Sequence, residues 1–306
     1  MPKYAFFKGR IVPIEEAKVS IMTHAFNYGT GCFEGIRAYW NDQEGQLFVF
    51  RLKEHFERMH RSARILRIGL AHTAEELSEI TVELLRREGY REDTYIRPLA
   101  YKVDEIVGVR LHNLTDGFAI FATPFGRYIE NEEGAHVCIS GWRRVGDNAV
   151  PARAKITGAY INSALSKTDA VLSGYDEALV LTEGGHISEG SAENFFMVRD
   201  GSLVTPPITS NILEGITRET IMTLAREEMG IRTIERSIDR SEIYVCDEAF
   251  LTGTGVQVAA ITQVEHRPIG TGSIGPVVSR LRELYFDVVR GKNPAYRQWC
   301  SPVYDT

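Results

Sequence analysis

The sequence predicts an α+β protein of two domains, a small strand-rich domain and a larger domain in which helices surround a mixed sheet. Three observations lead to this prediction. The chain has 306 residues, which favours two domains over one. Hydrophobic residues make up 43% of it, enough to build a core in each domain. Strand-like and helix-like patterns also occur on both sides of a segment that has no apolar period.

The first part of the chain combines strands with two helices. Short apolar runs predict strands over residues 4–7, 10–12, 47–51, 94–103 and 118–123. The first two strands flank the turn residues Lys8 and Gly9 and form a predicted hairpin. Helical spacing of apolar residues predicts one helix from Leu52 to Gly69 and another over residues 73–87, with Gly89 as its C-cap.

A change in composition predicts the domain boundary. Residues 124–134 are rich in glycine, proline and acidic residues and show no apolar period, which is typical of a connection between domains. We place the boundary near Glu130. The prediction is a small domain over residues 1–124, an interdomain loop over residues 125–135 and a large domain over residues 136–306.

The second part of the chain again mixes strands and helices. Strands are predicted over residues 137–139, 177–181, 194–198, 202–205 and 256–261. The third and fourth of these form a hairpin around Arg199-Asp200-Gly201. Helices are predicted over residues 157–172, 217–229 and 276–289, and Gly174 and Gly230 end the first two.

Charge and cysteine usage exclude several classes of protein. A formal net charge of -6 provides no basic field for nucleic acid. No uncharged stretch is long enough to cross a bilayer, and the first residues contain no signal-peptide core, so we expect a cytoplasmic protein. The four cysteines are scattered, which argues against disulfides and thiolate metal clusters.

Three short motifs resemble those of dinucleotide-binding proteins, serine hydrolases and metalloenzymes, but each is incomplete. Gly253-Thr254-Gly255 does not complete a dinucleotide fingerprint, and Gly190-Ser191 lacks the second glycine of a nucleophile elbow. His55 and His60 are five residues apart on one predicted helix, a spacing that does not put them on one face, and no H-E-x-x-H occurs. We therefore expect no catalytic metal.

Three segments are candidates for a functional site. Lys155 follows a proline-containing loop and precedes a helix, although a lone lysine is more often a solvated charge. Ser188-Glu189-Gly190 enters an apolar strand and can equally be a plain turn. Gly215-Ile216-Thr217 opens a helix, where backbone N–H groups can bind an anion, or where Thr217 can act as an ordinary N-cap.

Together with residues 28–37, 54–58, 95–98 and 253–255, these segments resemble the class IV aminotransferases, the fold-type-IV enzymes that use pyridoxal 5'-phosphate (PLP). The resemblance is strongest to the branched-chain amino-acid aminotransferases. It implies a small α/β domain and a larger domain whose mixed sheet forms a pseudo-barrel. It also implies a ping-pong exchange of the amino group between leucine, isoleucine or valine and 2-oxoglutarate.

The resemblance also implies roles for individual residues. Lys155 would be the catalytic residue, as Schiff-base lysine and as acid and base. Glu189 would bind the pyridine nitrogen and keep it protonated, so that the ring accepts electrons. The implied cofactor-binding residues are Arg58, Lys155, Tyr160, Glu189, Leu213, Gly215, Ile216, Thr217, Gly253 and Thr254.

Tyr95, Arg97 and Val107-Gly108-Val109 indicate the branched-chain substrate. Arg97 would receive the distal carboxylate of glutamate or 2-oxoglutarate. The loop with Val109 would reach the site of a neighbouring subunit, as would Tyr28, which requires a homodimer or a higher homo-oligomer. The implied substrate-binding residues are Tyr28, Phe33, Gly35, Tyr95, Arg97, Val109, Phe125, Tyr128, Tyr160, Thr254 and Gly255.

Two alternatives stay open at this point. Another fold-type-IV enzyme, such as a D-amino-acid or (R)-amine aminotransferase or a PLP lyase, would share the cofactor residues. A protein that binds PLP without turnover is the second alternative, although the presence of both Lys155 and Glu189 argues against it.

Overall fold

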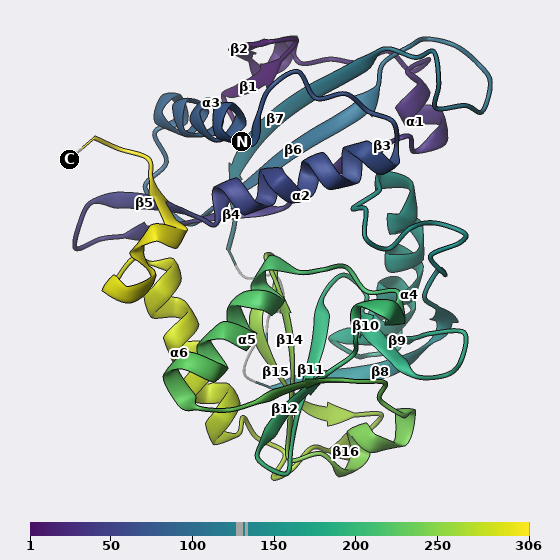
Figure 1. The fold of residues 1–306 in the computed structure, drawn as a ribbon, viewed down its shortest axis with the longest axis vertical. Coiled ribbons are helices and arrows are strands. Elements are labelled where there is room, and N and C mark those ends of the chain that lie inside the picture. Colours follow the sequence, from purple (N-terminus) through teal and green to yellow (C-terminus); the bar gives the residue numbers. More distant parts are fainter. Residues whose placement is uncertain (127–130, 132–133, 306) are drawn as a thin grey trace. The chain divides into compact units, whose positions relative to one another are not determined.

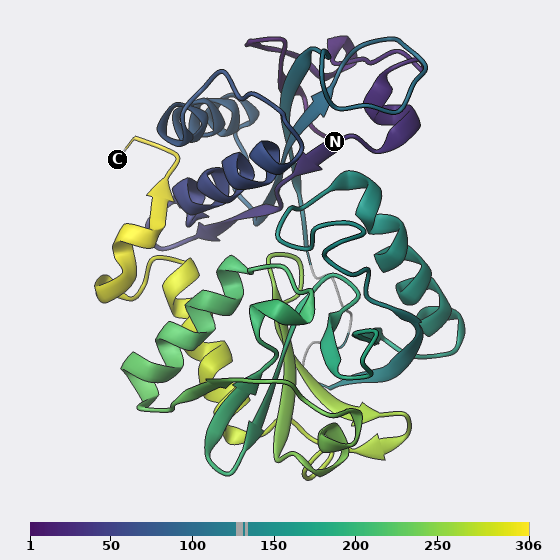
Figure 2. The ribbon, with the colours of Figure 1, turned by 45° about the vertical axis from the view of Figure 1, so that its right-hand side comes forward.

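The computed structural model describes residues 1–126, 131 and 134–305. Residue contacts divide the chain into two compact units. Unit 1 consists of Met1–Gly126, Ala154–Gly158 and Asp287–Thr306, and unit 2 of Arg127–Arg153 and Ala159–Phe286. Each unit has its own sheet (Figures 1 and 2). The predicted domains were continuous, with a small domain ending at residue 124 and a large one starting at residue 136. The residue contacts instead assign two later segments, Ala154–Gly158 and Asp287–Thr306, to the first unit.

The sheet of unit 1 is antiparallel throughout its described pairings. Its strand order is β17-β5-β4-β6-β7-β1-β2, and β3 pairs with β6. The strands are β1 (Tyr4–Phe7), β2 (Arg10–Pro13), β3 (Gly31–Phe33), β4 (Ile36–Asn41), β5 (Gln46–Phe50), β6 (Thr94–Lys102), β7 (Asp116–Pro124) and β17 (Cys300–Pro302). The helices are α1 (His24–Tyr28), α2 (Leu52–Ile65) and α3 (Ala74–Glu88), and α2 packs against α3.

Most elements predicted for the first part of the chain are confirmed. The β1–β2 hairpin turns at Lys8 and Gly9, which both have positive φ. Helix α3 begins after the N-cap Thr73 and ends at Gly89, whose φ is 70°. Helix α2 ends at Ile65, earlier than predicted. Strands β3 and β4 were not predicted, because they are buried almost throughout and therefore lack the alternation that marks a half-exposed strand.

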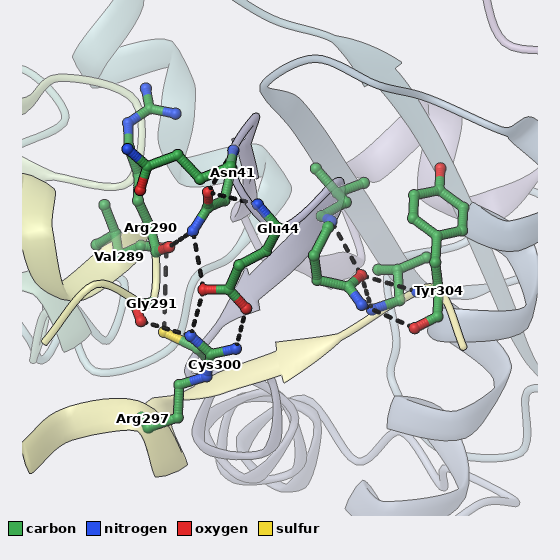
Figure 3. Close-up of polar contacts among 12 residues, drawn as sticks. Asn41, Glu44, Val289, Arg290, Gly291, Arg297, Cys300 and Tyr304 are labelled. Carbon is green, nitrogen blue, oxygen red and sulfur yellow. Dashed lines mark hydrogen bonds and ion pairs between the residues drawn. The ribbon is translucent and has the colours of Figure 1, made fainter. Parts of the chain in front are cut away.

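The segment after Phe286 belongs with unit 1 because it pairs with that sheet. Strand β17 pairs with β5, with Cys300 opposite Phe50. Arg297 binds both carboxylate oxygens of Glu44, and the side-chain amide of Asn41 donates to the carbonyl of Arg290 (Figure 3). These contacts join the end of the chain to residues about 250 positions earlier, a separation at which no local sequence pattern operates.

The sheet of unit 2 is mixed, as predicted. Its order is β10-β9-β8-β15-β14-β11-β12-β13, and β16 pairs with β15. Strand β8 pairs in parallel with both β9 and β15, and β12 with β13. The strands are β8 (Ala135–Arg143), β9 (Glu177–Leu181), β10 (Ile187–Gly190), β11 (Asn194–Arg199), β12 (Ser202–Thr205), β13 (Thr233–Glu235), β14 (Glu248–Gly253), β15 (Gln257–Val264) and β16 (Arg267–Pro268).

The helices predicted for the second part of the chain are confirmed with small changes at their starts. They are α4 (Tyr160–Leu172), α5 (Ile216–Met229) and α6 (Pro276–Val289). Short 3-10 helices lie at Ile14–Glu16, Thr157–Ala159, Ile208–Ser210, Arg240–Val245 and Pro294–Trp299. The hairpin of β11 and β12 is also confirmed. None of the described helices has the length and apolar character needed to cross a membrane.

Candidate active site

Lys155 lies in a short segment whose backbone is held on both sides within unit 1. Its N–H donates to Ser62 Oγ on α2 at 3.2 Å, and its carbonyl accepts from the N–H of Phe33 on β3 at 3.0 Å. The side chain is half-buried, with Nζ 5.2 Å from the centre of the Phe33 ring. The backbone of Lys155 is therefore fixed, and its side chain is partly shielded from solvent rather than a solvated surface charge.

Close approach of two backbones fixes the same segment at its other end. Thr157 Oγ1 donates to the carbonyls of Gly29 and Gly31, each at 3.0 Å. A Cβ on Gly29 would lie 2.7 Å from Gly158 Cα, so this contact requires glycine. The positive φ of Gly29, 64°, gives a second reason for glycine there. The position of Lys155 thus depends on three glycines and one threonine.

Arg58 takes part in a buried ion pair next to this segment. It is 4% exposed, and its Nε and Nη2 donate to the two carboxylate oxygens of Glu34 at 2.8 and 2.7 Å. His55 Nδ1 lies 2.8 Å from Glu34 Oε2. The two-point geometry fixes the plane of the guanidinium. Arg58 is therefore not an ordinary surface arginine on an amphipathic helix.

The charge states of this cluster follow from burial and pairing. Burial by itself would raise the pKa of Glu34, but the Arg58 cation and the hydrogen bonds from Arg58 and His55 outweigh it and lower that pKa to about 2. Burial lowers the pKa of His55, because a charged imidazole is costly away from water. At neutral pH the cluster therefore combines an ionised Glu34, a cationic Arg58 and a neutral His55.

Four predicted substrate residues of unit 1 come together around Arg97. The Arg97 guanidinium lies 4.3 Å from the centre of the Phe33 ring, and its Nη2 donates to the Tyr95 hydroxyl at 2.7 Å. The Tyr95 and Phe125 rings are 5.2 Å apart. A Cβ on Gly35 would lie 2.4 Å from the Tyr95 hydroxyl oxygen, so the glycine makes room for that group. Phe33, Tyr95 and Phe125 thus form an aromatic wall around the cationic side chain of Arg97.

Tyr28 and the loop with Val109 lie together in another part of unit 1. The N–H of Gly108 donates to the Tyr28 hydroxyl at 3.1 Å, and His24 Nε2 lies 2.9 Å from the Gly108 carbonyl. Gly108 has a φ of 139°, which favours glycine. Val109 is 85% exposed. Within the described chain, the Val109 side chain thus faces solvent. Tyr128 lies outside the described residues.

Glu189, on β10, is the centre of a buried hydrogen-bond network in unit 2. One carboxylate oxygen lies 2.5 Å from Arg144 Nη2. The other accepts from the side-chain amide of Asn194 at 3.1 Å and from the N–H of Leu213 at 3.2 Å. A Cβ on Gly215 would clash with Asn194 Oδ1, so Gly215 is needed beside this network. Glu189 is an oriented carboxylate and not part of a plain turn.

The start of α5 has the properties of an anion site. Gly215 is the N-cap and provides no side-chain cap, and the helix begins at Ile216. The alternative that Thr217 is the N-cap is therefore wrong. The first backbone N–H groups of a helix have no acceptor inside it, and the helix dipole is positive there. Ile216 and Thr217 can thus present donors to a phosphate group.

The remaining predicted residues of unit 2 lie at the ends of elements. Gly253 is the last residue of β14, and Thr254 and Gly255 lie, with Val256, in the turn into β15. Tyr160 is the first residue of α4. Element ends of this kind expose backbone groups and side chains, which suits ligand binding.

Each unit also has two residues, in contact with a predicted one, that the sequence reasoning missed as site residues: Glu34 and His55 in unit 1, and Arg144 and Asn194 in unit 2. Glu34 and His55 stand inside motifs that supported the resemblance, so their positions alone offered a signal. A 3-10 helix, α4, β9 and the start of β10 lie between Arg144 and Glu189, and no local pattern connects the two residues. Among the described residues, no three His, Cys, Asp or Glu side chains are arranged to hold a metal ion.

The chain is similar to known proteins over nearly its whole length. The family described as Amino-transferase class IV matches residues 31–264. A probable branched-chain-amino-acid aminotransferase of Aquifex aeolicus (strain VF5) is 50% identical over 302 residues, covering 99% of this chain and 97% of the relative.

Two solved structures share the fold. The branched-chain aminotransferase of the thermophilic archaeon Thermoproteus uzoniensis, solved with norvaline, has a TM-score of 0.95 and 43% identity, covering 99% of this chain and 100% of that one. The T.th. branched-chain amino acid aminotransferase, solved with N-(5'-phosphopyridoxyl)-L-glutamate, has a TM-score of 0.93 and 41% identity, with 99% of each chain covered.

Proposed function

The chain belongs to the class IV aminotransferases, and from this premise we propose that it exchanges the amino group between branched-chain L-amino acids and 2-oxoglutarate with PLP as cofactor. The Aquifex relative carries the name of this activity. The two similar structures contain an unbranched apolar amino acid in one case and a phosphopyridoxyl conjugate of glutamate in the other. An apolar donor and an acidic partner are the two substrate types that the proposal requires.

The observation that carries the proposal is the fixed, half-buried Lys155. A lysine that forms a covalent bond with a carbonyl cofactor must present its amine in one place, and both backbone groups of Lys155 are bonded. We propose that Lys155 Nζ also takes the proton from the substrate α-carbon and returns it. A positioned amine serves as base and acid in the two directions.

The groups that each unit presents have the chemistry that PLP requires. For the phosphate, the chain offers the uncapped start of α5 and the oriented guanidinium of Arg58, together with Thr254. For the ring nitrogen it offers the Glu189 carboxylate, which Arg144, Asn194 and the Leu213 N–H hold in a defined orientation. Bound PLP would supply the electron sink for the pair released from the α-carbon. Leu213, Gly215 and Gly253 would contribute backbone contacts, and Tyr160 would contact the phenolic oxygen.

For the substrates, we propose that Arg97 receives the distal carboxylate of glutamate. Its Nε is buried and has no hydrogen-bond partner in the described chain, and a buried cationic donor is costly to leave unsatisfied. The proposed apolar wall is Phe33, Gly35, Tyr95, Phe125, Tyr128, Tyr160 and Val109. Thr254 and Gly255, with Tyr95, would hold the α-carboxylate.

We propose further that the enzyme is at least a homodimer, in which Tyr28 and Val109 of one subunit complete the site of the other. An exposed apolar patch on α1 and its adjoining loops supports this proposal. It consists of Ile21, Met22, Phe26, Val107 and Val109. The loop with Val107 and Val109 lies beside α1, because the Gly108 N–H donates to the Tyr28 hydroxyl, and large apolar side chains exposed in one part of a domain usually mark an interface. A location in the cytoplasm stays a prediction, supported by four free thiols.

Sedimentation of the purified protein tests the dimer. The wild-type protein should sediment as a dimer or a larger oligomer, and the double variant Phe26→Asp/Val109→Asp should dissociate and lose activity. Val245→Asp is the matched control, because Val245 is an exposed valine of unit 2. A monomeric and fully active wild-type protein would refute the proposal.

One spectroscopic experiment tests the activity. The absorbance of the bound cofactor is recorded while L-leucine, D-alanine or an (R)-amine is added in turn. We expect L-leucine alone to convert the cofactor to its amine form, and 2-oxoglutarate to reverse the change. Conversion by D-alanine or the (R)-amine alone would indicate another fold-type-IV activity, and no change with any donor would indicate a protein that binds PLP without turnover.

A further inference from the structure

Arg37, on β4, is a buried cation outside the predicted site residues. It is 4% exposed. Its Nη2 donates to two successive main-chain carbonyls, those of Phe125 at 3.1 Å and Gly126 at 2.8 Å. One guanidinium nitrogen thus holds two residues that are 88 and 89 positions away in the sequence.

These two residues lie just beyond the end of a strand. The pairing of β7 with β6 ends at Pro124, opposite Thr94. Phe125 is nevertheless held on both sides, because its N–H donates to the Asp93 carbonyl at 2.9 Å and its own carbonyl accepts from Arg37. Arg37 therefore extends the fixed backbone past the strand and into the first residues of the loop.

The guanidinium also holds the Phe125 ring. The Arg37 Cζ lies 5.3 Å from the centre of that ring and 5.5 Å from the centre of the Tyr39 ring. Contacts of this kind between a cation and aromatic faces are attractive, and more so away from water. The Phe125 ring also lies next to Tyr95, at 5.2 Å between ring centres. A continuous series of contacts leads from Arg37 through Phe125 to the proposed substrate pocket.

We propose that Arg37 is a positioning residue for substrate specificity, which holds Phe125 as the wall against branched-chain side chains. This inference rests on the proposed function. An apolar pocket discriminates through contact with its wall, so a displaced Phe125 weakens the reaction of leucine. The reaction of glutamate depends chiefly on the charge of Arg97, which Phe33 and Tyr95 contact directly, so we expect a change at Arg37 to affect it less.

The test compares two half-reactions of one variant. Arg37→Met keeps an unbranched side chain but removes the charge and all donors. Its kcat/KM is measured separately for L-leucine and L-glutamate from the cofactor absorbance. We expect the leucine value to fall about tenfold more than the glutamate value, in the range of a lost wall contact. The absorbance spectrum and the retention of the cofactor should stay as in the wild-type enzyme.

Arg297→Met is the matched control. Arg297 also donates to a main-chain carbonyl, that of Gly291 (Figure 3). Its guanidinium lies 4.3 Å from the centre of an aromatic ring, that of Phe48. It contacts Glu44 instead of the pocket. The leucine-to-glutamate ratio should not change in this variant. An equal change in both variants would show a general loss of stability and overturn the proposal.

A double-mutant cycle tests whether Arg37 acts through Phe125. Phe125→Ala should shift the ratio in the same direction, and adding Arg37→Met to it should produce little further shift. Additive shifts would overturn the proposed route. If Arg37→Met does not fold, Arg37→Lys replaces it, with a smaller shift expected and an unchanged ratio contradicting the proposal. A wild-type enzyme inactive with leucine would refute the proposed function instead.

Discussion

Glu34 and Arg58 are joined by two hydrogen bonds, of 2.8 and 2.7 Å, at a site where Glu34 has no exposed surface. Breaking a buried pair by removing one charge is costly, because the other charge stays buried without compensation. Glu34→Gln should therefore lower the free energy of unfolding by about 3 kcal/mol, measured by urea denaturation. Glu16→Gln, which removes an exposed partner of Arg10 at 4.0 Å, should change it little. Similar effects of the two substitutions would contradict this account of the pair.

The same pair should stabilise the protein in a defined pH range. The pKa of Glu34 in the folded protein, about 2, lies below its ordinary value of 4.5. The folded state therefore binds this proton less readily than the unfolded state. The stabilisation is present above about pH 4.5 and is lost as pH falls towards 2. The difference in stability between wild type and Glu34→Gln should narrow across this interval in urea titrations, and a constant difference would contradict the assignment.

Glu193 should make the protein less stable as pH rises, whereas Glu34 makes it less stable as pH falls. Burial, together with the charge of Glu177, raises the pKa of Glu193 to about 8. The folded protein therefore keeps a proton that the unfolded chain releases, and this contribution reduces stability as pH rises from about 4.5 towards about 8. Glu193→Gln should become more stable relative to wild type between about pH 5 and about pH 8. Glu183→Gln, an exposed glutamate, is the control, and the same trend in both would count against Glu193 as the cause.

Lys155→Ala should abolish both the visible absorbance of the bound cofactor and turnover. The reason is that no other amine would take the position that Ser62 and Phe33 fix through the Lys155 backbone. Lys53→Ala removes an exposed lysine of the same unit and should leave absorbance and turnover intact. If Lys155→Ala kept both the absorbance and turnover, the proposed role of Lys155 in binding the cofactor and in catalysis would be wrong.

Gly35→Ala should impair catalysis by steric displacement alone. The added Cβ would lie 2.4 Å from the Tyr95 hydroxyl oxygen, and Tyr95 would have to move away from Arg97. We expect kcat/KM for leucine to fall roughly tenfold to a hundredfold, as for other small misplacements of a binding group. In Gly69→Ala the nearest atom is 3.4 Å from the added Cβ, an ordinary contact, so its activity should be unchanged. Wild-type activity in Gly35→Ala would show that Tyr95 can shift without consequence.

Local sequence patterns predicted those helices and strands whose own residues mark their ends or turns. Helix α3 has Thr73 and Gly89 at its two ends, and the β1–β2 hairpin has Lys8 and Gly9 at its turn. Strands such as β3 and β4 carry no such signal, because both of their faces are buried and their residues do not alternate. The joining of β17 to β5 was also invisible, since it depends on residues about 250 positions apart.

The residues of the candidate site also fall into those that local motifs predicted and those that only the structure revealed. By itself the sequence determined the family and the residues that its motifs contain, including Lys155, Glu189 and the start of α5, because these motifs are short and contiguous. The tertiary structure alone decided that Glu34 pairs with Arg58, that Arg144 pairs with Glu189 and that Arg37 holds Phe125. Such contacts depend on geometry between distant segments, and an isolated sequence contains no period or spacing that encodes that geometry.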